Sequence, residues 1–296
     1  MERITVERIT VHGYAKINLT LKVLSRRDDG YHEIESIMQK IDLFDEIVVN
    51  DRRDGRINIT SNNPDIPQHP MNGSLNIATK AAELLKNRYA PDRGADIFIL
   101  KRIPVAAGLG GGSSDAAACL LGLMRLWDLR IDGEDLLDLG SEIGSDVPFA
   151  LSTPTAIVKG RGERVTPVNP PAPFWVTLVK PDPPLLAAQA YGELDARGGS
   201  YPGDGARVID GIRSGDVALL ASGIGNALQG PVERLVPGVT PIIERLKTFS
   251  PLGVMVSGSG PTVVAIAANR GHAEAMCGGF RGEPGIEHAT VTRTLA

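Results

Sequence analysis

The chain has 296 residues, enough for one large or two modest domains, and its 42% share of hydrophobic residues is ordinary for a globular protein. Its net charge is −4 and no run of Lys and Arg is longer than two residues, which disfavours nucleic acid or an anionic membrane surface as a partner. No stretch of 18 apolar residues predicts a membrane helix, the first residues lack a signal-peptide core, and the two cysteines form no CxxC motif. We therefore expect a cytoplasmic protein without a disulfide scaffold, in which Cys119 is a buried small hydrophobe.

The N-terminus carries a direct repeat, because Glu2–Val6 recurs as Glu7–Val11. Two interpretations stay open: an extended first strand, or upstream sequence included by the choice of start codon. The following residues, 9–24, are rich in β-branched side chains and predict a strand, as do residues 45–50.

Helical and extended patterns then alternate up to the middle of the chain. Ser74 is the expected N-cap of a helix, because apolar side chains follow it at helical spacing in Ile77, Ala81, Leu84 and Leu85. Residues 96–100 predict a short strand, and residues 134–143 a short helix. Residues 155–165 are typical of a hairpin that turns on its glycines.

The second half begins with a proline-dense stretch, 167–173, which indicates a linker. A buried strand is expected over 174–180 and a mobile surface loop over 197–205. Near the end, two strands flank a turn at Gly258–Gly260, followed by a helix near 271–278 and a last strand around 289–295. Strands and helices do not alternate strictly, so the expected fold class is α+β rather than a doubly wound sheet.

The most informative segment is the run PVAAGLGGGSSD at residues 104–115, in which four glycines fall within five positions. Glycine allows positive φ and lets backbone N–H groups approach a ligand. A helix is expected directly after the run, because apolar side chains recur in Ala117, Leu120, Leu121 and Met124. A glycine loop that opens a helix offers unpaired N–H groups and a partial positive charge, which suits a phosphate. The simpler alternative is a flexible turn with a serine as N-cap.

Two better-known phosphate motifs do not fit this run. A P-loop requires a lysine directly after its last glycine, and none follows here. A dinucleotide fingerprint counted from Gly108 would place its third glycine at position 113, which is a serine.

The run resembles the second motif of the GHMP kinases, the family of galactokinase, homoserine kinase, mevalonate kinase and phosphomevalonate kinase. YAKINL at residues 14–19 resembles the first motif, and VSGSGPT at 256–262 resembles the third. Together the motifs cover nearly the whole chain. Within the family, DGYHE at 29–33 and GSDVPF at 144–149 are typical of members that act on a cytidine diphosphate-linked methylerythritol in the non-mevalonate isoprenoid pathway.

This resemblance implies a two-domain fold, with an ATP-binding domain over 1–166 like ribosomal protein S5 domain 2 and a ferredoxin-like domain over 167–296. The active site would lie in the cleft between the domains. The implied reaction is ATP-dependent phosphorylation of the acceptor's 2-hydroxyl group, with ATP and Mg²⁺ as cofactors. The implied partner is a small-molecule substrate, not nucleic acid or a membrane, and the enzyme would be a monomer or homodimer.

The resemblance also implies a catalytic pair, Lys16 and Asp146. The aspartate would take the hydroxyl proton, and the lysine would keep it ionised and steady the developing charge. From the residues alone, the favoured interpretation of Lys16 is a solvated strand lysine. Asp146, two residues before Pro148, could equally cap a helix.

The nucleotide would contact the glycine loop, and the hydroxyl group of Ser113 or Ser114 could reach Mg²⁺, although either serine could instead cap the helix. The residues expected to bind ATP are Asn76, near the base, and Pro104, Ala107, Gly108, Leu109, Gly110, Gly111, Gly112, Ser113 and Ser114.

The acceptor would be bound through its cytosine and its phosphates. Tyr31 and His32 would hold the ring, by an aromatic face and a polar edge, and Tyr191 would be a second stacking aromatic. The other residues implied for substrate binding are Asn18, Gly258 and Gly260. Alternatively, Tyr31 could lie at a core edge, His32 at the surface, and Gly258–Gly260 could be a bare turn.

One segment departs from the family pattern. Where the family usually has Asn-Asp-Leu-Glu, residues 226–229 read NALQ, and we infer that this segment supports structure rather than chemistry. Two other functions are considered: another GHMP kinase, of the homoserine or mevalonate type, and a nucleotide-binding regulator without catalysis. The first is disfavoured by Tyr31, His32 and GSDVPF, and the second by the presence of Lys16 and Asp146.

Overall fold

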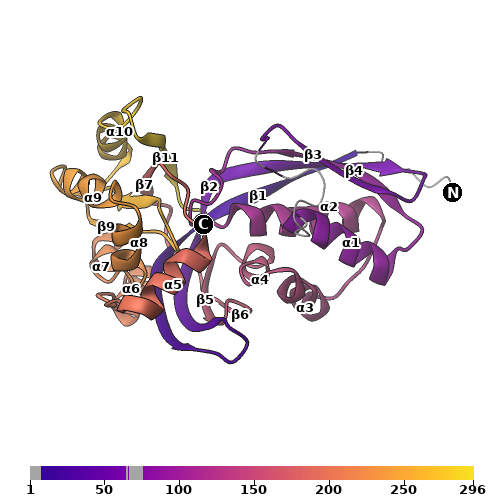
Figure 1. Cartoon of the computed structure of the whole chain (residues 1–296), viewed down its shortest axis with the longest axis horizontal. Coiled ribbons are helices and arrows are strands. Elements are labelled where there is room, and N and C mark those ends of the chain that lie inside the picture. The colour runs from indigo at the N-terminus through magenta and orange to yellow at the C-terminus, as the bar shows by residue number, and fades with distance from the viewer. Residues whose placement is uncertain (1–7, 65, 67–75) are drawn as a thin grey trace. The chain divides into compact units, whose positions relative to one another are not determined.

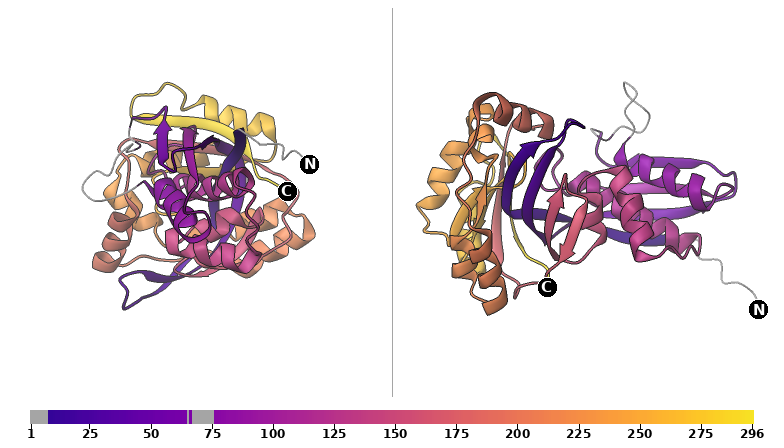
Figure 2. Two further views of the ribbon diagram at one scale, coloured as in Figure 1. Left: turned by 90° about the vertical axis from the view of Figure 1, so that its right-hand side faces the viewer. Right: turned by 90° about the horizontal axis from the view of Figure 1, so that it is seen from below.

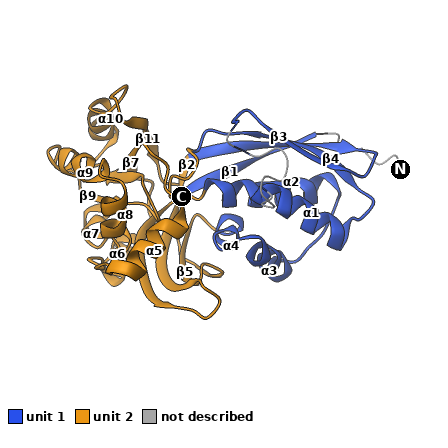
Figure 3. Ribbon diagram, in the orientation of Figure 1, with its two compact units in different colours: residues 1–15, 43–103, 111–152 blue, residues 16–42, 104–110, 153–296 orange. Residues whose placement is uncertain are grey.

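The structure is a computed structural model that describes residues 8–64, 66 and 76–296 (Figure 1). The expected N-cap Ser74 and most of the N-terminal repeat lie outside these residues. The chain forms two compact units that interleave in sequence (Figure 3). Unit 1 comprises residues 1–15, 43–103 and 111–152, and unit 2 comprises residues 16–42, 104–110 and 153–296. Both contain helices and strands, so the predicted α+β class is confirmed.

Unit 1 is built on strands in the order β3-β4-β2-β1. It contains the N-terminal part of β1 (Arg8–Arg26), the C-terminal part of β2 (His32–Arg52), and all of β3 (Ile57–Ser61) and β4 (Gly94–Leu100). Strand β4 runs antiparallel to β2, with Ile97 opposite Val49, and parallel to β3.

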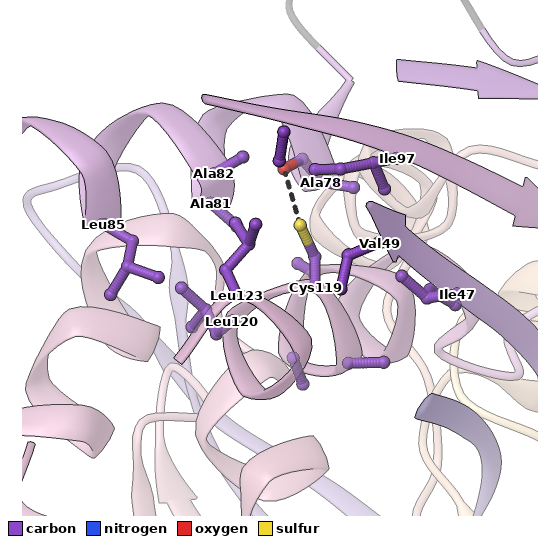
Figure 4. Packing of buried hydrophobic residues seen from close by; sticks show 14 of the residues in the cluster. Ile47, Val49, Ala78, Ala81, Ala82, Leu85, Ile97, Cys119, Leu120 and Leu123 are labelled. Carbon is purple, nitrogen blue, oxygen red and sulfur yellow. Dashed lines mark hydrogen bonds between the residues drawn. The ribbon is translucent and has the colours of Figure 1, made fainter. Parts of the chain in front are cut away.

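The helices of unit 1 cover one face of these strands (Figures 1 and 2). They are α1 (Ile77–Tyr89), α2 (Gly111–Leu126), α3 (Gly133–Ile143) and α4 (Val147–Leu151). Helix α2 carries a broad apolar face, and Figure 4 shows Cys119, Leu120 and Leu123 packed against side chains of α1 and of the strands. The Cys119 thiol is buried, as expected, and burial raises its pKa.

Unit 2 contains the remaining parts of β1 and β2 and a separate four-stranded sheet. Strand β2 pairs with β5 (Thr155–Gly160), which forms the predicted hairpin with β6 (Arg164–Pro167), and β1 pairs in parallel with β8 (Gly225–Asn226). The separate sheet is antiparallel, in the order β11-β7-β10-β9. Its strands are β7 (Trp175–Pro181), β9 (Gly253–Val256), β10 (Val263–Ile266) and β11 (Ile286–Arg293).

Six helices complete unit 2. Three of them, α8, α9 and α10, contact the four-stranded sheet and share a buried apolar cluster with it. The helices are α5 (Ala187–Arg197), α6 (Gly205–Ser214), α7 (Val217–Ser222), α8 (Gln229–Leu235), α9 (Val239–Lys247) and α10 (Arg270–Gly278). None of the helices in the described ranges is long and apolar enough to cross a membrane.

The predicted helices and strands are found, each within a few residues of its expected bounds, except that β2 begins at His32, well before residue 45. The helix expected after Ser74 begins at Ile77, and Asn76 caps it by accepting from the N–H of Ala78 at 2.9 Å. The sequence did not predict strand β3 or the helices between 187 and 247. Residues 198–204 have no regular structure and lie mostly at the surface, in agreement with the expected loop.

The packing of α2 gives a stability prediction. Leu120 is fully buried, whereas Met124, one turn later, is only partly buried. Leu120→Ala should lower the free energy of unfolding by about 2–5 kcal/mol, because it removes buried methyl groups and leaves a cavity. Met124→Ala is the control and should cost clearly less in the same urea titration. Equal losses would contradict this assignment of the buried face.

Candidate active site

Strand β1 places Lys16, Asn18 and Thr20 on one face, because alternate residues of a strand point the same way. The Lys16 Nζ donates to Asn18 Oδ1 at 2.7 Å and to the carbonyl oxygen of Gly108 at 3.1 Å. Lys16 is only 7% exposed, so it is not a solvated strand lysine. Its ammonium group is therefore held in a defined position within unit 2.

Asn18 is itself held by its neighbours. Its Nδ2 donates to the hydroxyl oxygen of Ser36 at 2.8 Å, and that hydroxyl donates to the carbonyl oxygen of Thr20 at 2.5 Å. An amide side chain has two N–H groups and two lone pairs, and these bonds use one of each. Asn18, which is buried, thus orients Lys16, and its contact with the substrate stays a prediction. Ser36 was not predicted, because nothing in its local sequence distinguishes it from an ordinary strand serine.

The turn at Gly258–Gly260 is a tight hairpin between β9 and β10, which pair at Val256 and Val263. The N–H of Ser257 donates to the carbonyl oxygen of Thr262, and the N–H of Gly260 to that of Ser257, both at 2.9 Å. Gly258 has φ of 56° and Gly260 has φ of 71°, values that favour glycine. A Cβ on Gly258 would lie 2.9 Å from Lys16 Nζ, so this turn lies directly beside the lysine.

The first half of the glycine loop, residues 108–110, contacts both of these segments. A Cβ on Gly108 would lie 2.2 Å from the carbonyl oxygen of Ser257, a distance that excludes any side chain. The Ser257 hydroxyl donates to the carbonyl oxygen of Gly108 at 3.2 Å. The N–H of Lys16 donates to the carbonyl oxygen of Leu109 at 2.9 Å. Unit 2 therefore brings together residues from all three sequence motifs.

Asn226 holds the backbone at the β9–β10 turn through buried hydrogen bonds. It is 1% exposed, and its Nδ2 donates to the carbonyl oxygens of Val256 at 2.8 Å and Gly258 at 2.7 Å. Its Oδ1 accepts from the N–H of Leu228. All of these bonds are internal, in agreement with a structural role for residues 226–229.

The second half of the loop opens helix α2 in unit 1. Gly111 is the first residue of the helix, Gly112 is exposed, and Ser113 is partly exposed. Ser114 is buried, and its hydroxyl donates to the carbonyl oxygen of Gly111 at 2.8 Å. Upstream, in unit 2, Ala107 is buried and Pro104 is partly exposed. The N-terminus of a helix of 16 residues is thus open at Gly112, where a phosphate group could approach the backbone.

A buried ion cluster packs against the start of α2, and its residues were not predicted from the sequence. Lys101 Nζ contacts Asp45 Oδ2 at 2.5 Å and Asp115 Oδ2 at 2.8 Å, and all three side chains are at most 4% exposed. Burial raises the pKa of Asp115 to about 8, although the Lys101 charge opposes the shift. A Cβ on Gly111 would lie 3.3 Å from Lys101 Nζ, so the cluster directly supports the loop.

Asp146 and Asn76 both lie at helix starts in unit 1, with different side-chain roles. Asp146 occupies the N-cap position of α4, but its side chain makes no capping hydrogen bond, and it is partly exposed. The alternative of a capping carboxylate therefore does not hold. Asn76 does cap α1, through Oδ1, and its Nδ2 is a separate donor group. In the described ranges, no cluster of three or more His, Cys, Asp and Glu side chains could hold a metal.

The residues predicted to hold a cytosine ring lie in unit 2, and two of them touch. The rings of His32 and Tyr191 are stacked, with centroids 4.8 Å apart and planes 23° apart. His32 Nε2 lies 2.8 Å from Asp195 Oδ1. Tyr31 is 49% exposed, and the Arg161 guanidinium lies over its ring, 5.0 Å from the centroid. Neither Tyr31 at a core edge nor His32 as a surface histidine describes these positions. Asp195 had not been predicted.

Comparisons with known proteins agree on one family. The model for the GHMP kinases N terminal domain matches residues 76–153, and the model for the GHMP kinases C terminal domain matches residues 208–282. A 4-diphosphocytidyl-2-C-methyl-D-erythritol kinase of Shouchella clausii is 42% identical over 275 residues, covering 93% of this chain and 91% of that protein. The protein of the same name in Bacillus subtilis is 40% identical, covering 93% of each chain.

Solved structures agree with this result. A crystal structure of 4-(cytidine 5'-diphospho)-2C-methyl-D-erythritol kinase has a TM-score of 0.78 and 29% identity, covering 97% of this chain and all of that one. A homoserine kinase from Cytophaga hutchinsonii has a TM-score of 0.74 at 17% identity, covering all of this chain and 97% of the other, a likeness that shows the fold alone.

The role of Asn226 can be tested by a change of one group. Asn226→Asp replaces a donor to two buried carbonyl oxygens by a carboxylate that repels them, and should cost about 2–5 kcal/mol of stability. Asn269→Asp is the matched control, because Asn269 caps α10 through its oxygen, which aspartate retains. Urea titration measures both variants. A loss for Asn226→Asp no greater than that of the control would rule out the supporting role.

Proposed function

Because the chain belongs to the 4-diphosphocytidyl-2-C-methyl-D-erythritol kinase family of the GHMP kinases, we propose that it transfers the γ-phosphoryl group of ATP to the 2-hydroxyl group of 4-diphosphocytidyl-2-C-methyl-D-erythritol. The observation that carries this proposal is identity of 40–42% over about nine-tenths of both chains with relatives of that name. The product would enter isoprenoid precursor synthesis. The family uses ATP with a divalent metal, and we propose Mg²⁺ for this chain.

The start of α2 fits the phosphates of ATP. The N–H groups of a helix's first turn have no partner within the helix, and the exposed Gly112 has no side chain to cover them. We assign the phosphate cradle to residues 108–114 and the base contact to Asn76. Ser114 is buried whereas Ser113 is partly exposed, so we propose Ser113 as the better ligand for Mg²⁺. When bound, the ion would offset phosphate charge.

The acceptor hydroxyl needs a base, and we assign that role to Asp146. Its carboxylate is not used to cap α4, so helix geometry does not require it there. Lys16 supplies a positive charge whose position is determined by Asn18 and Gly108. A pre-positioned cation stabilises charge as it develops and costs no reorganisation during the reaction. In this assignment Asp146 accepts the proton, and Lys16 stabilises the developing charge.

We assign the cytosine of the acceptor to Tyr31, His32 and Tyr191, and the acceptor phosphates to Gly258 and Gly260. We also propose that the chain has two domains, over residues 1–166 and 167–296. We further propose that it is a monomer or homodimer in the cytoplasm. It includes no nucleic-acid partner.

The direct test is ATP consumption with four acceptors: the cytidylated methylerythritol, homoserine, mevalonate and galactose. We expect turnover with the first alone. Turnover with homoserine or mevalonate would replace the proposed substrate. ATP binding without turnover on any acceptor would favour a silent regulator.

The base assignment predicts a large effect on turnover. Asp146→Asn should lower kcat by about 10²–10⁴, because a neutral amide cannot accept the hydroxyl proton. The ATP dissociation constant should change little. Asp132→Asn is the matched control, since Asp132 is the N-cap residue of α3 and does form its capping bond. Wild-type kcat in folded Asp146→Asn would remove this residue from the mechanism.

The cradle assignment predicts an effect on ATP binding. Gly112→Val places a branched side chain over the first-turn N–H groups, while its Cβ would meet only Ile77 Cγ2, at 3.3 Å. Losing one charge-assisted hydrogen bond should raise the ATP dissociation constant about 10- to 100-fold in calorimetry. The control is Gly133→Val, which makes the same change in the first turn of α3, where the new Cβ would have no neighbour within 4 Å. This variant should leave the ATP dissociation constant unchanged. Equal affinities of the two variants would refute the cradle.

A further inference from the structure

Helix α5 presents two side chains to His32. Tyr191 and Asp195 are four residues apart, so they lie on the same face of the helix, one turn from each other. Tyr191 stacks on the imidazole, and Asp195 Oδ1 lies 2.8 Å from its Nε2. The His32 side chain is 8% exposed, so its ring is held by these two contacts rather than by solvent.

The Asp195 contact determines which ring nitrogen carries the proton. An ionised carboxylate can only accept hydrogen bonds, so the nitrogen that faces it must be the N–H. A neutral imidazole has one donor and one acceptor nitrogen, and a hydrogen bond at one nitrogen therefore selects the state of the other. Within the described part of the chain, the Nε2 bond is the one hydrogen bond of this ring. Nδ1 is consequently left as an acceptor.

We propose that Asp195 is a positioning residue that keeps His32 in the tautomer with Nδ1 as acceptor, and that this nitrogen selects a cytosine over a uracil. The inference rests on the proposed function, because it concerns the base of the proposed acceptor.

The nearly parallel rings of His32 and Tyr191 are compatible with a base whose edge meets Nδ1. The His32 and Tyr191 planes are 23° apart, which is nearly parallel. A base stacked on Tyr191 beside His32 would therefore lie close to the plane of the imidazole and meet its edge. Cytosine carries an amino group, a donor, where uracil carries a carbonyl oxygen, an acceptor. As an acceptor, Nδ1 would form a hydrogen bond with the amino group of cytosine and would repel the carbonyl oxygen of uracil.

Arg26 adds to the role of the carboxylate. Its NH1 lies 3.7 Å from Asp195 Oδ2, the oxygen that does not contact His32. The two oxygens of Asp195 therefore have different neighbours: Oδ2 faces a guanidinium group and Oδ1 faces the imidazole. An amide at this position could rotate and offer either its oxygen or its NH₂ group to Nε2. Only the acid enforces a single tautomer.

The test compares two acceptors that differ in the base, the CDP-linked and the UDP-linked methylerythritol, at a pH of about 8. Wild type should prefer the CDP form in kcat/KM by about 5- to 150-fold, the effect of one matched against one mismatched base contact. Asp195→Ala and Asp195→Asn should each lower this preference at least about fivefold, with the KM for ATP unchanged. Glu193→Gln is the matched control: Glu193, on the same helix, pairs with Arg234 rather than with His32, so the preference should be retained.

Nitrogen-15 NMR of the His32 ring gives an independent readout in the ligand-free protein. Wild type should show a protonated Nε2 and an unprotonated Nδ1, and Asp195→Ala should show a mixture. A protonated Nδ1 in wild type overturns the inference, as does a CDP preference that Asp195→Ala leaves intact. If wild type phosphorylates neither acceptor, the proposed function fails and the selectivity fails with it, while the spectrum still decides whether Asp195 selects the tautomer.

Discussion

The carbonyl oxygen of Gly108 is the point on which the arrangement of unit 2 depends. It accepts from Lys16 Nζ at 3.1 Å and from the Ser257 hydroxyl at 3.2 Å, and so joins three segments that are far apart in sequence. Residues 108 and 257 can approach this closely because Gly108 has no side chain. A Cβ at position 108 would overlap the Ser257 carbonyl oxygen. An ammonium group removed from water needs several acceptors, and this carbonyl is one of them. The position of Lys16 therefore follows from a backbone contact, not from the strand alone.

A second constraint acts on the other half of the loop. Two buried carboxylates share one ammonium below the start of α2, an arrangement with an excess negative charge if both are ionised. Asp45 is the better satisfied, since it also accepts from the N–H groups of Arg102 and Ile103. Asp115 Oδ1 has no partner among the described residues, and burial raises the pKa of that carboxyl group to about 8. A proton kept on Asp115 near neutral pH leaves one anion for one cation, which a buried site tolerates.

How much the sequence predicts depends on whether a signal is local. The glycine run, the spacing of apolar residues in α2 and the β9–β10 turn are local patterns, and each is found where it was predicted. The ion cluster below α2 was missed because its members come from positions 45, 101 and 115, and no local pattern relates them. Helix α5 was missed for a different reason: only Ala190 is fully buried in it, so it carries a weak apolar stripe. Asp195 was missed with it, although Tyr191 had been selected by resemblance.

The four glycines of the loop, taken one at a time, separate packing from ligand binding. Gly108 and Gly110 have positive φ, and a Cβ on either would collide with unit 2 atoms, at Ser257 or at Lys16. A Cβ on Gly111 would press on Ile103 at 3.0 Å and on Lys101. These three are explained by the fold without any ligand. Gly112 is not: it is exposed, its φ is not in the left-handed region, and a Cβ would meet one methyl group at 3.3 Å. Packing therefore does not explain a glycine at position 112, and this is why we propose Gly112 as the place where a phosphate approaches the helix backbone.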